Sequence, residues 1–144
     1  MTYLQRLEFW GEAHHPKYVD LLRIAFGIFL CFKGVQFANN TTMLEQLVGG
    51  NFNSFLQSLI VHYVLFAHIV GGFLIAVGLL TRLACLIQIP IVLGAFIFVH
   101  WDMVQHFSAI LTAVITLILL CYFLVIGNGP WSLEKVLFRE GDQE

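Results

Sequence analysis

Four long apolar runs restrict what this chain can fold into more than any other feature of its sequence. They span roughly residues 19–38, 58–80, 83–101 and 107–127, and the second and fourth contain no Asp, Glu, Lys or Arg. A helix of about 20 mainly apolar residues crosses the hydrocarbon core of a bilayer. The runs are too long for strands and lack strict alternation, and four strands cannot close a barrel in lipid. The sequence therefore predicts an all-α integral membrane protein, a bundle of four helices.

The composition agrees with a chain that lies mostly in lipid. Hydrophobic residues make up 59% of the 144 residues, charged residues make up 11%, and the mean hydropathy is +0.85. Soluble domains carry about 25% charged residues, so this chain has too little polar surface to coat a water-soluble globule. Its length fits a single domain, residues 1–144. The net charge of -2 and the scattered basic residues argue against a nucleic-acid partner.

The basic residues predict the orientation of the bundle. The first 17 residues contain Glu8 and Glu12 and no apolar core, so we expect no cleaved signal peptide. The connections 39–57 and 101–106 contain no Lys or Arg. The basic residues near helix ends all fall on the other side of the membrane: Arg6, Lys17, Arg23, Arg82, Lys135 and Arg139. By the positive-inside rule both termini are cytoplasmic, and we expect a multi-pass protein of the inner (plasma) membrane.

The predicted connections are short, except the first. Thr81-Arg82 is the expected turn between the second and third helices, with Arg82 at the cytoplasmic interface. In the first outer loop Thr42 and Glu45 form a capping box, which predicts a short surface helix. Trp131, after the fourth helix, is expected to anchor the cytoplasmic side of the membrane interface.

Small residues predict where the helices pack closely. In the second helix Ala67 and Gly71 are four residues apart, and so are Gly72 and Ala76, a spacing that lets helix backbones approach. We expect the same contribution from three glycines of the first and third helices: Gly27, Gly34 and Gly94. Hydroxyls in the fourth helix are expected to bond across helices or to their own backbone carbonyls: Ser108, Thr112 and Thr116.

Polar residues within the predicted helices are candidates for function, because an ionisable group inside a membrane is costly. Arg23 is explained by a local ion pair with Asp20, three residues earlier. Lys33 lies about 20 Å along the first helix and has no acidic residue three or four positions away. The predicted orientation gathers these polar residues toward the outer leaflet: Lys33, Gln36, His62, His68, His100, Asp102 and His106.

Three interpretations of this outer group remain open. In the first, it lines a cavity that binds a quinone headgroup, because histidine can donate a hydrogen bond to a carbonyl and can carry a proton. Three phenylalanines could flank such a ring: Phe37, Phe66 and Phe98. His62 and His68 point about 120° apart on a helix, so they cannot both line one narrow site.

In the second interpretation two histidines ligate haem or a metal ion, with His68 opposite His100 or His106. No zinc-protease or Cys-His motif is present, so no metal-ligand set is predicted. In the third, Lys33 extends to the outer surface and pairs with Asp102 or Glu45, and the histidines are only hydrated.

Three segments, in this order, resemble the DoxX family of membrane proteins. They are residues 21–27 (LLRIAFG) with Lys33-Gly34, residues 71–98 (GGFLIAVGLLTRLACLIQIPIVLGAFIF), and residues 127–134 (GNGPWSLE). The similarity covers roughly residues 19–138. It implies a four-helix membrane protein associated with respiratory or redox machinery, since some members are subunits of quinone-reducing sulfur oxidation enzymes. It carries over no catalytic residue.

We therefore expect a non-autonomous subunit of a membrane redox complex that contributes an outer quinone-binding cavity. The chain has no nucleotide fingerprint, no haem-attachment motif and no large soluble head, so an independent enzyme is not expected. The alternatives are a purely structural or assembly subunit, a haem- or metal-binding protein, and a small-molecule carrier. Expected partners are the lipid bilayer, and other membrane subunits or further copies of the chain.

Overall fold

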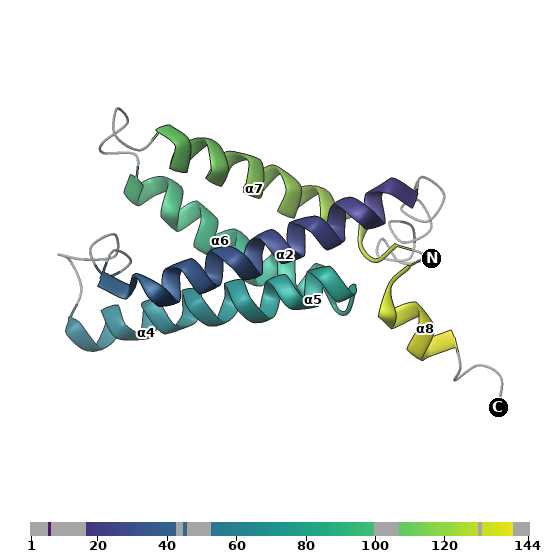
Figure 1. Ribbon diagram of the computed structural model, residues 1–144, viewed down its shortest axis with the longest axis horizontal. Coiled ribbons are helices and arrows are strands. Elements are labelled where there is room, and N and C mark those ends of the chain that lie inside the picture. Colours follow the sequence, from purple (N-terminus) through teal and green to yellow (C-terminus); the bar gives the residue numbers. More distant parts are fainter. Residues whose placement is uncertain are drawn as a thin grey trace.

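Helices make up the whole of the regular structure in the part of the chain that the computed structural model describes. That part comprises Arg6, residues 17–42, Glu45, and residues 53–99, 107–129 and 131–139. It contains no strand, and the predicted all-α fold of four long helices is confirmed (Figure 1). The elements are α2 (Lys17–Asn39), α4 (Ser54–Phe66), the π-helix η1 (Ala67–Gly71), α5 (Gly72–Val77), α6 (Thr81–Val99), α7 (Phe107–Ile126) and α8 (Leu133–Arg139).

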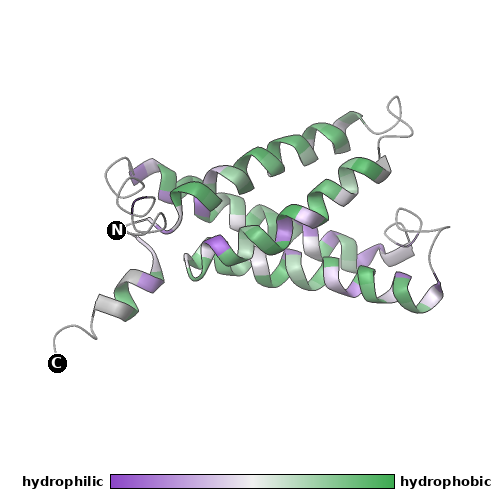
Figure 2. Cartoon of the chain, turned by 180° about the vertical axis from the view of Figure 1, so that it is seen from behind, coloured by the Kyte–Doolittle hydropathy of each residue, from purple (hydrophilic) through white to green (hydrophobic). Residues whose placement is uncertain are grey.

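The length and surface of these helices identify a membrane protein. Three helical segments are long and apolar enough to cross a bilayer: Lys17–Asn39, Ser54–Val77 and Phe107–Ile126. The third of the four long helices, α6, has a shorter apolar stretch, Thr81–Ile97. Figure 2 shows that most residues of the long helices are apolar, and large side chains such as Ile97 and Ile118 are exposed. Such a surface requires lipid as its solvent.

The turn between the second and third long helices differs from the prediction. Thr81-Arg82 was the expected turn, but both residues belong to α6, which begins at Thr81. The chain turns instead at Gly78, which has φ of +75° and ends α5, and Leu80 also has a positive φ of 49°. A left-handed glycine after the last helical residue is a common helix stop, because glycine has no Cβ to clash there. The second segment also begins earlier than predicted, at Ser54.

The two ends of the bundle have different elements, and we name them accordingly. The basal end contains Lys17, the Gly78–Thr81 turn and the connection from α7 to α8; the distal end contains Asn39, Ser54, Val99 and Phe107 (Figure 1). In the first distal loop Thr41, Thr42 and Glu45 have helical backbone, while Met43 and Leu44 of the predicted surface helix lie outside the described residues.

Helix α2 packs against the second long segment through backbone-to-backbone contact. A Cβ atom added to Gly27 would overlap the Ala76 amide nitrogen and lie 2.5 Å from the Gly72 carbonyl oxygen. Conversely, a Cβ added to Gly72 would lie 2.8 Å from the Gly27 carbonyl oxygen. Farther along, a Cβ on Gly34 would lie 2.6 Å from Cγ1 of Ile69. The predicted small-residue contact is therefore confirmed for these positions, where a larger side chain would have to push the helices apart.

The prediction for Gly94 is wrong, and Gly71 has a different neighbour. No atom lies within 4 Å of a Cβ built on Gly94, so this glycine of α6 makes no close helix contact among the described residues. A Cβ on Gly71 would lie 2.6 Å from Nε2 of Gln88, so this glycine makes room for a polar side chain from α6. The spacing of small residues identifies candidates for close contact, but the facing helix decides which are used.

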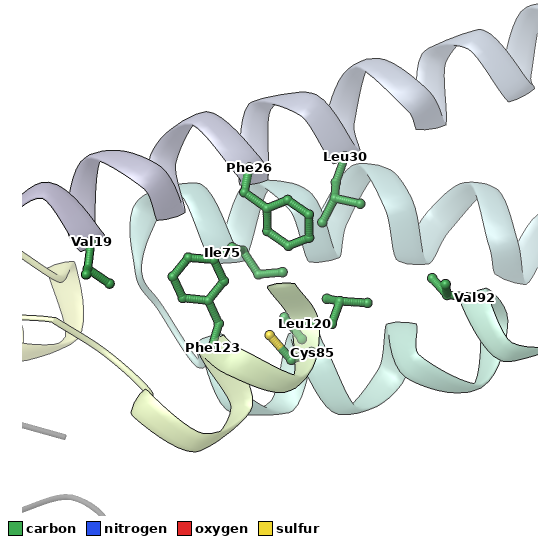
Figure 3. Close-up of a cluster of buried hydrophobic side chains, with 9 residues drawn as sticks. Val19, Phe26, Leu30, Ile75, Cys85, Val92, Leu120 and Phe123 are labelled. Carbon is green, nitrogen blue, oxygen red and sulfur yellow. The ribbon is translucent and has the colours of Figure 1, made fainter. Parts of the chain in front are cut away.

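The apolar core lies where α2, α5, α6 and α7 meet, toward the basal half of the bundle. Figure 3 shows Phe26, Ile75, Cys85, Leu120 and Phe123 together in this core. The rings of Phe26 and Phe123 stack with centroids 5.8 Å apart, which joins α2 to α7. Beyond this contact the two helices diverge toward the distal end (Figure 1). The backbones of α2 and α7 are consequently closer together at the basal end than at the distal end (Figure 1).

The contact through Gly27 gives a direct test of the packing. Gly27→Val should lower the free energy of unfolding by about 1–3 kcal/mol, because the added atoms meet backbone that cannot move alone. The measurement is reversible unfolding in mixed micelles of mild and denaturing detergent. Gly94→Val, on the same kind of helix with open space around it, is the matched control and should change the free energy of unfolding by less than about 1 kcal/mol. Equal losses in the two variants would contradict the close contact.

Candidate functional site

A buried ion pair joins the basal end of α2 to the segment after α7. Nη1 of Arg23 lies 3.0 Å from Oδ1 of Asp20, as the sequence predicts, but both side chains are almost fully buried, at 1% and 0% exposure. The pair also holds the backbone of Trp131. The Trp131 amide donates to Asp20 Oδ2 at 3.2 Å, and Arg23 Nη2 donates to the Trp131 carbonyl at 3.3 Å. The pair is therefore a long-range attachment and not only a local one.

Residues on either side of Trp131 complete this basal attachment. The side chain of Glu134 accepts hydrogen bonds from the Leu80 amide, at 3.1 Å, and from the Asn128 side-chain amide. The guanidinium of Arg82 lies against Gly127, where a Cβ would be 2.6 Å from Nε, and Gly127 has φ of +76°. The Trp131 side chain is exposed, as an interfacial anchor would be. Arg23 and Arg82 thus hold the α7–α8 connection, Arg23 through the backbone of Trp131 and Arg82 through its contact with Gly127.

A second group of polar residues lies within the long helices and centres on η1. His68 is buried, at 7% exposure, and its Nδ1 donates to the Val64 carbonyl at 2.9 Å. The proton is therefore on Nδ1, and Nε2 of the neutral ring is left as an acceptor. The Phe37 ring meets the His68 ring edge-on, with centroids 5.3 Å apart. Phe37 is the predicted flanking ring that the structure places beside a histidine.

Two backbone carbonyls of the π-helix accept hydrogen bonds from side chains of the neighbouring helices α2 and α6. Nε2 of Gln88, a residue with 0% exposure, donates to the Ala67 carbonyl at 3.1 Å, and Sγ of Cys31 donates to the Ile69 carbonyl at 3.3 Å. Single-turn π-helices within α-helices occur frequently at functional sites. The sequence analysis missed Gln88; the signal was a lone amide inside an otherwise apolar third helix.

Lys33 lies one turn from Phe37 on α2 and is half-buried. Its Nζ sits 5.9 Å from the centroid of the Phe29 ring, a cation–π contact. The predicted pairing with Glu45 is wrong for the described residues: no ion pair joins them. Glu45 instead accepts a hydrogen bond from Gln57 through its backbone carbonyl, at 2.8 Å. Within the described residues, Lys33 has no anionic partner.

The remaining predicted site residues are not gathered around His68. His62 is exposed and its Nδ1 donates to the Ser58 carbonyl at 2.7 Å, so it does not share the buried environment of His68. Gln36 is exposed, and the predicted flanking residue Phe66 is 67% exposed. Three predicted site residues lie outside the described residues: His100, Asp102 and His106. The side chain of Phe98 is also outside the described part of the chain. The predicted haem pairing of His68 with His100 or His106 therefore stays a prediction.

These observations define a membrane bundle of four long helices that has polar groups at two levels. One level is the basal attachment around Asp20 and Arg23, and the other is the distal set around Lys33 and His68. A family model for DoxX matches residues 18–101, which is more than half of the chain, and the chain belongs to the DoxX family. No curated protein and no solved structure matches it. The match ends before α7, so the resemblance of residues 127–134 to the closing segment of the family stays a prediction.

The basal pair can be tested by a double-mutant cycle. Asp20→Leu alone should lower the free energy of unfolding by about 3–5 kcal/mol, because it leaves the Arg23 charge buried without a counter-ion. Asp20→Leu with Arg23→Met removes both charges and should be less destabilised than Asp20→Leu alone, although the Trp131 backbone then loses its partners.

Lys17→Met, at the exposed start of the same helix, is the control for loss of a charge and should have little effect. The readout is unfolding in mixed micelles. Additive losses from Asp20→Leu and Arg23→Met would show that the two residues do not interact.

Proposed function

We propose that this DoxX-family chain is a non-autonomous subunit of a membrane redox complex and that its distal half binds a quinone headgroup. The observation that carries the proposal is the grouping of a cation, an aromatic ring and a histidine at one level inside the long helices. Lys33 and Phe37 are one turn apart on α2, and Phe37 contacts His68 of η1. Ionisable residues within a membrane are costly and mark functional sites by default.

The three side chains have complementary chemistry toward a quinone. The Lys33 ammonium has only donors, so it can bond a quinone carbonyl oxygen. The bare Nε2 of His68 is an acceptor, so it can receive the hydroxyl of the reduced, hydroquinone form. Phe37 lies against the His68 ring and offers an apolar face for a planar ligand. Together they can recognise both redox states of one headgroup.

The location of the site supports a lipid-soluble ligand. Lys33 is six residues from the distal end of α2, a depth of about 9 Å along the helix. By the distribution of Lys and Arg, the distal end faces the outer side of the inner membrane and both termini face the cytoplasm. A quinone that diffuses within the bilayer reaches this depth without leaving the lipid. Electron transfer itself is assigned to a partner subunit.

The two described histidines of the second long segment give a matched test of this proposal. The chain is purified in mild detergent, reconstituted in nanodiscs that contain quinone, and the retained quinone is extracted and quantified per protein. His68→Leu and Lys33→Met should each reduce retention about tenfold, the effect of losing a hydrogen bond worth roughly 1.5 kcal/mol. His62→Leu, which alters an exposed histidine six residues away, should retain quinone as the wild type does.

Folding of each variant is checked by helical circular dichroism and elution volume. Retention in Lys33→Met and His68→Leu equal to that in His62→Leu would contradict the proposed headgroup site. A Soret band in the visible spectrum that disappears in His68→Leu would instead assign the histidine to haem. Stable co-purifying subunits without quinone or haem would favour a structural or assembly role.

A further inference from the structure

An apolar groove lies between α2 and α7. Its volume is about 360 Å³. It is lined by Leu22, Phe26 and Phe29 of α2 and by Thr112, Ile115, Thr116 and Leu119 of α7. All seven residues belong to helices long and apolar enough to cross the bilayer, so the groove lies at the depth of lipid chains.

The groove results from the way α2 is held. Close contact at Gly27 and Gly72 binds α2 to the second long segment, while Phe26 and Phe123 join α2 to α7 only near the basal half. Distal to that stacked pair the two helices diverge, as Figures 1 and 2 show. On α2 the groove begins beside this stacked pair, at Leu22 and Phe26, and extends to Phe29.

The groove continues into the proposed headgroup site along one face of α2. Leu22, Phe26 and Phe29 are followed at the same helical spacing by Lys33, and the Lys33 ammonium lies over the ring of Phe29. Lys33 and Leu22 are eleven residues apart, or about 16 Å along the helix. The groove therefore has a cation beyond its distal end and a mainly apolar lining.

Two threonines of α7, Thr112 and Thr116, line the groove. Thr112 donates to the Ser108 carbonyl at 2.7 Å, so its hydroxyl is satisfied within its own helix. Thr116 also lines the groove, and its side chain is largely buried, at 6% exposure.

We propose that this groove holds the apolar tail of the quinone whose headgroup lies at Lys33 and His68, an inference that rests on the proposed function. A tailed quinone is an amphipathic molecule with a polar ring at one end and a linear hydrocarbon chain at the other. The site has the same order, with a cation and a histidine toward the distal end and an apolar groove running toward the basal half. The tail enters sideways from the bilayer, between α2 and α7.

Two isoleucines of α7 provide a matched pair of variants. Ile115 lines the groove and is 49% exposed, whereas Ile118 is 62% exposed and does not line it. Ile115→Trp should fill the groove without overpacking the core, and Ile118→Trp adds the same side chain to the lipid-facing side. Each variant is reconstituted in nanodiscs with one of two quinones that share a headgroup, one with a long prenyl tail and one without a tail.

The expected result is selective. Ile115→Trp should lower retention of the long-tailed quinone about tenfold, because the added ring system occupies the groove. It should leave retention of the tail-less quinone within about twofold of the wild type. Ile118→Trp should change neither. Unfolding in mixed micelles confirms that both variants are folded.

The other outcomes separate the two proposals. If Ile115→Trp does not affect the long-tailed quinone, or lowers both quinones equally, the groove does not hold the tail, and the headgroup site still stands on the Lys33 and His68 variants. If the wild type retains neither quinone, the proposed function and the tail groove both fail.

Discussion

The contact between α2 and the second long segment is the constraint on which the rest of the bundle depends. Gly27 and Gly72 let the two backbones meet directly, and Gly34 makes room for the Ile69 side chain farther along the same contact. In lipid, where apolar burial gives no driving force between helices, such close packing and interhelical hydrogen bonds stabilise association. On another face, α2 meets α7 in the apolar core, where the rings of Phe26 and Phe123 stack. Distal to this stacked pair the two helices diverge (Figure 1).

The polar groups of the described residues lie at two levels, of which the basal one stabilises the fold and the distal one forms the proposed site. At the basal end Asp20 and Arg23 neutralise each other, and both bond the backbone of Trp131. Toward the distal end, Lys33 has an aromatic ring and no described acid, and His68 uses one nitrogen within its own helix and presents the other as an acceptor. Among the described residues the basal cation has a carboxylate partner and Lys33 has none, which is why we place the proposed site at the distal level.

The sequence predicted the parts of the structure that depend on periodicity and length. The helical class, the positions of the four long helices, the Asp20–Arg23 pair and the contacts at Gly27 and Gly72 were all visible as apolar runs or fixed spacings. The π-helix at Ala67–Gly71 was not, because it depends on donors from two other helices, Cys31 and Gln88, that meet its carbonyls only in three dimensions. Gly94 was predicted to make a close helix contact and makes none among the described residues, because a small residue does so only where another helix faces it. The sequence predicted that His62 and His68 point in different directions on their helix, and the structure adds that only His68 is buried.

The divergence of α2 and α7 can be measured directly by pulsed electron paramagnetic resonance between pairs of spin labels in nanodiscs. One pair, at Gln36 and Ser108, reports the distal separation, and the other, at Leu21 and Val125, reports the basal separation; all four positions are exposed. We predict a distal distance clearly longer than the basal distance, because α2 is held against the second long segment and stacks on α7 at Phe26 and Phe123 in its basal half. Equal distances, or a shorter distal distance, would describe a bundle closed along its whole length, which would contradict both the open groove and the site above it.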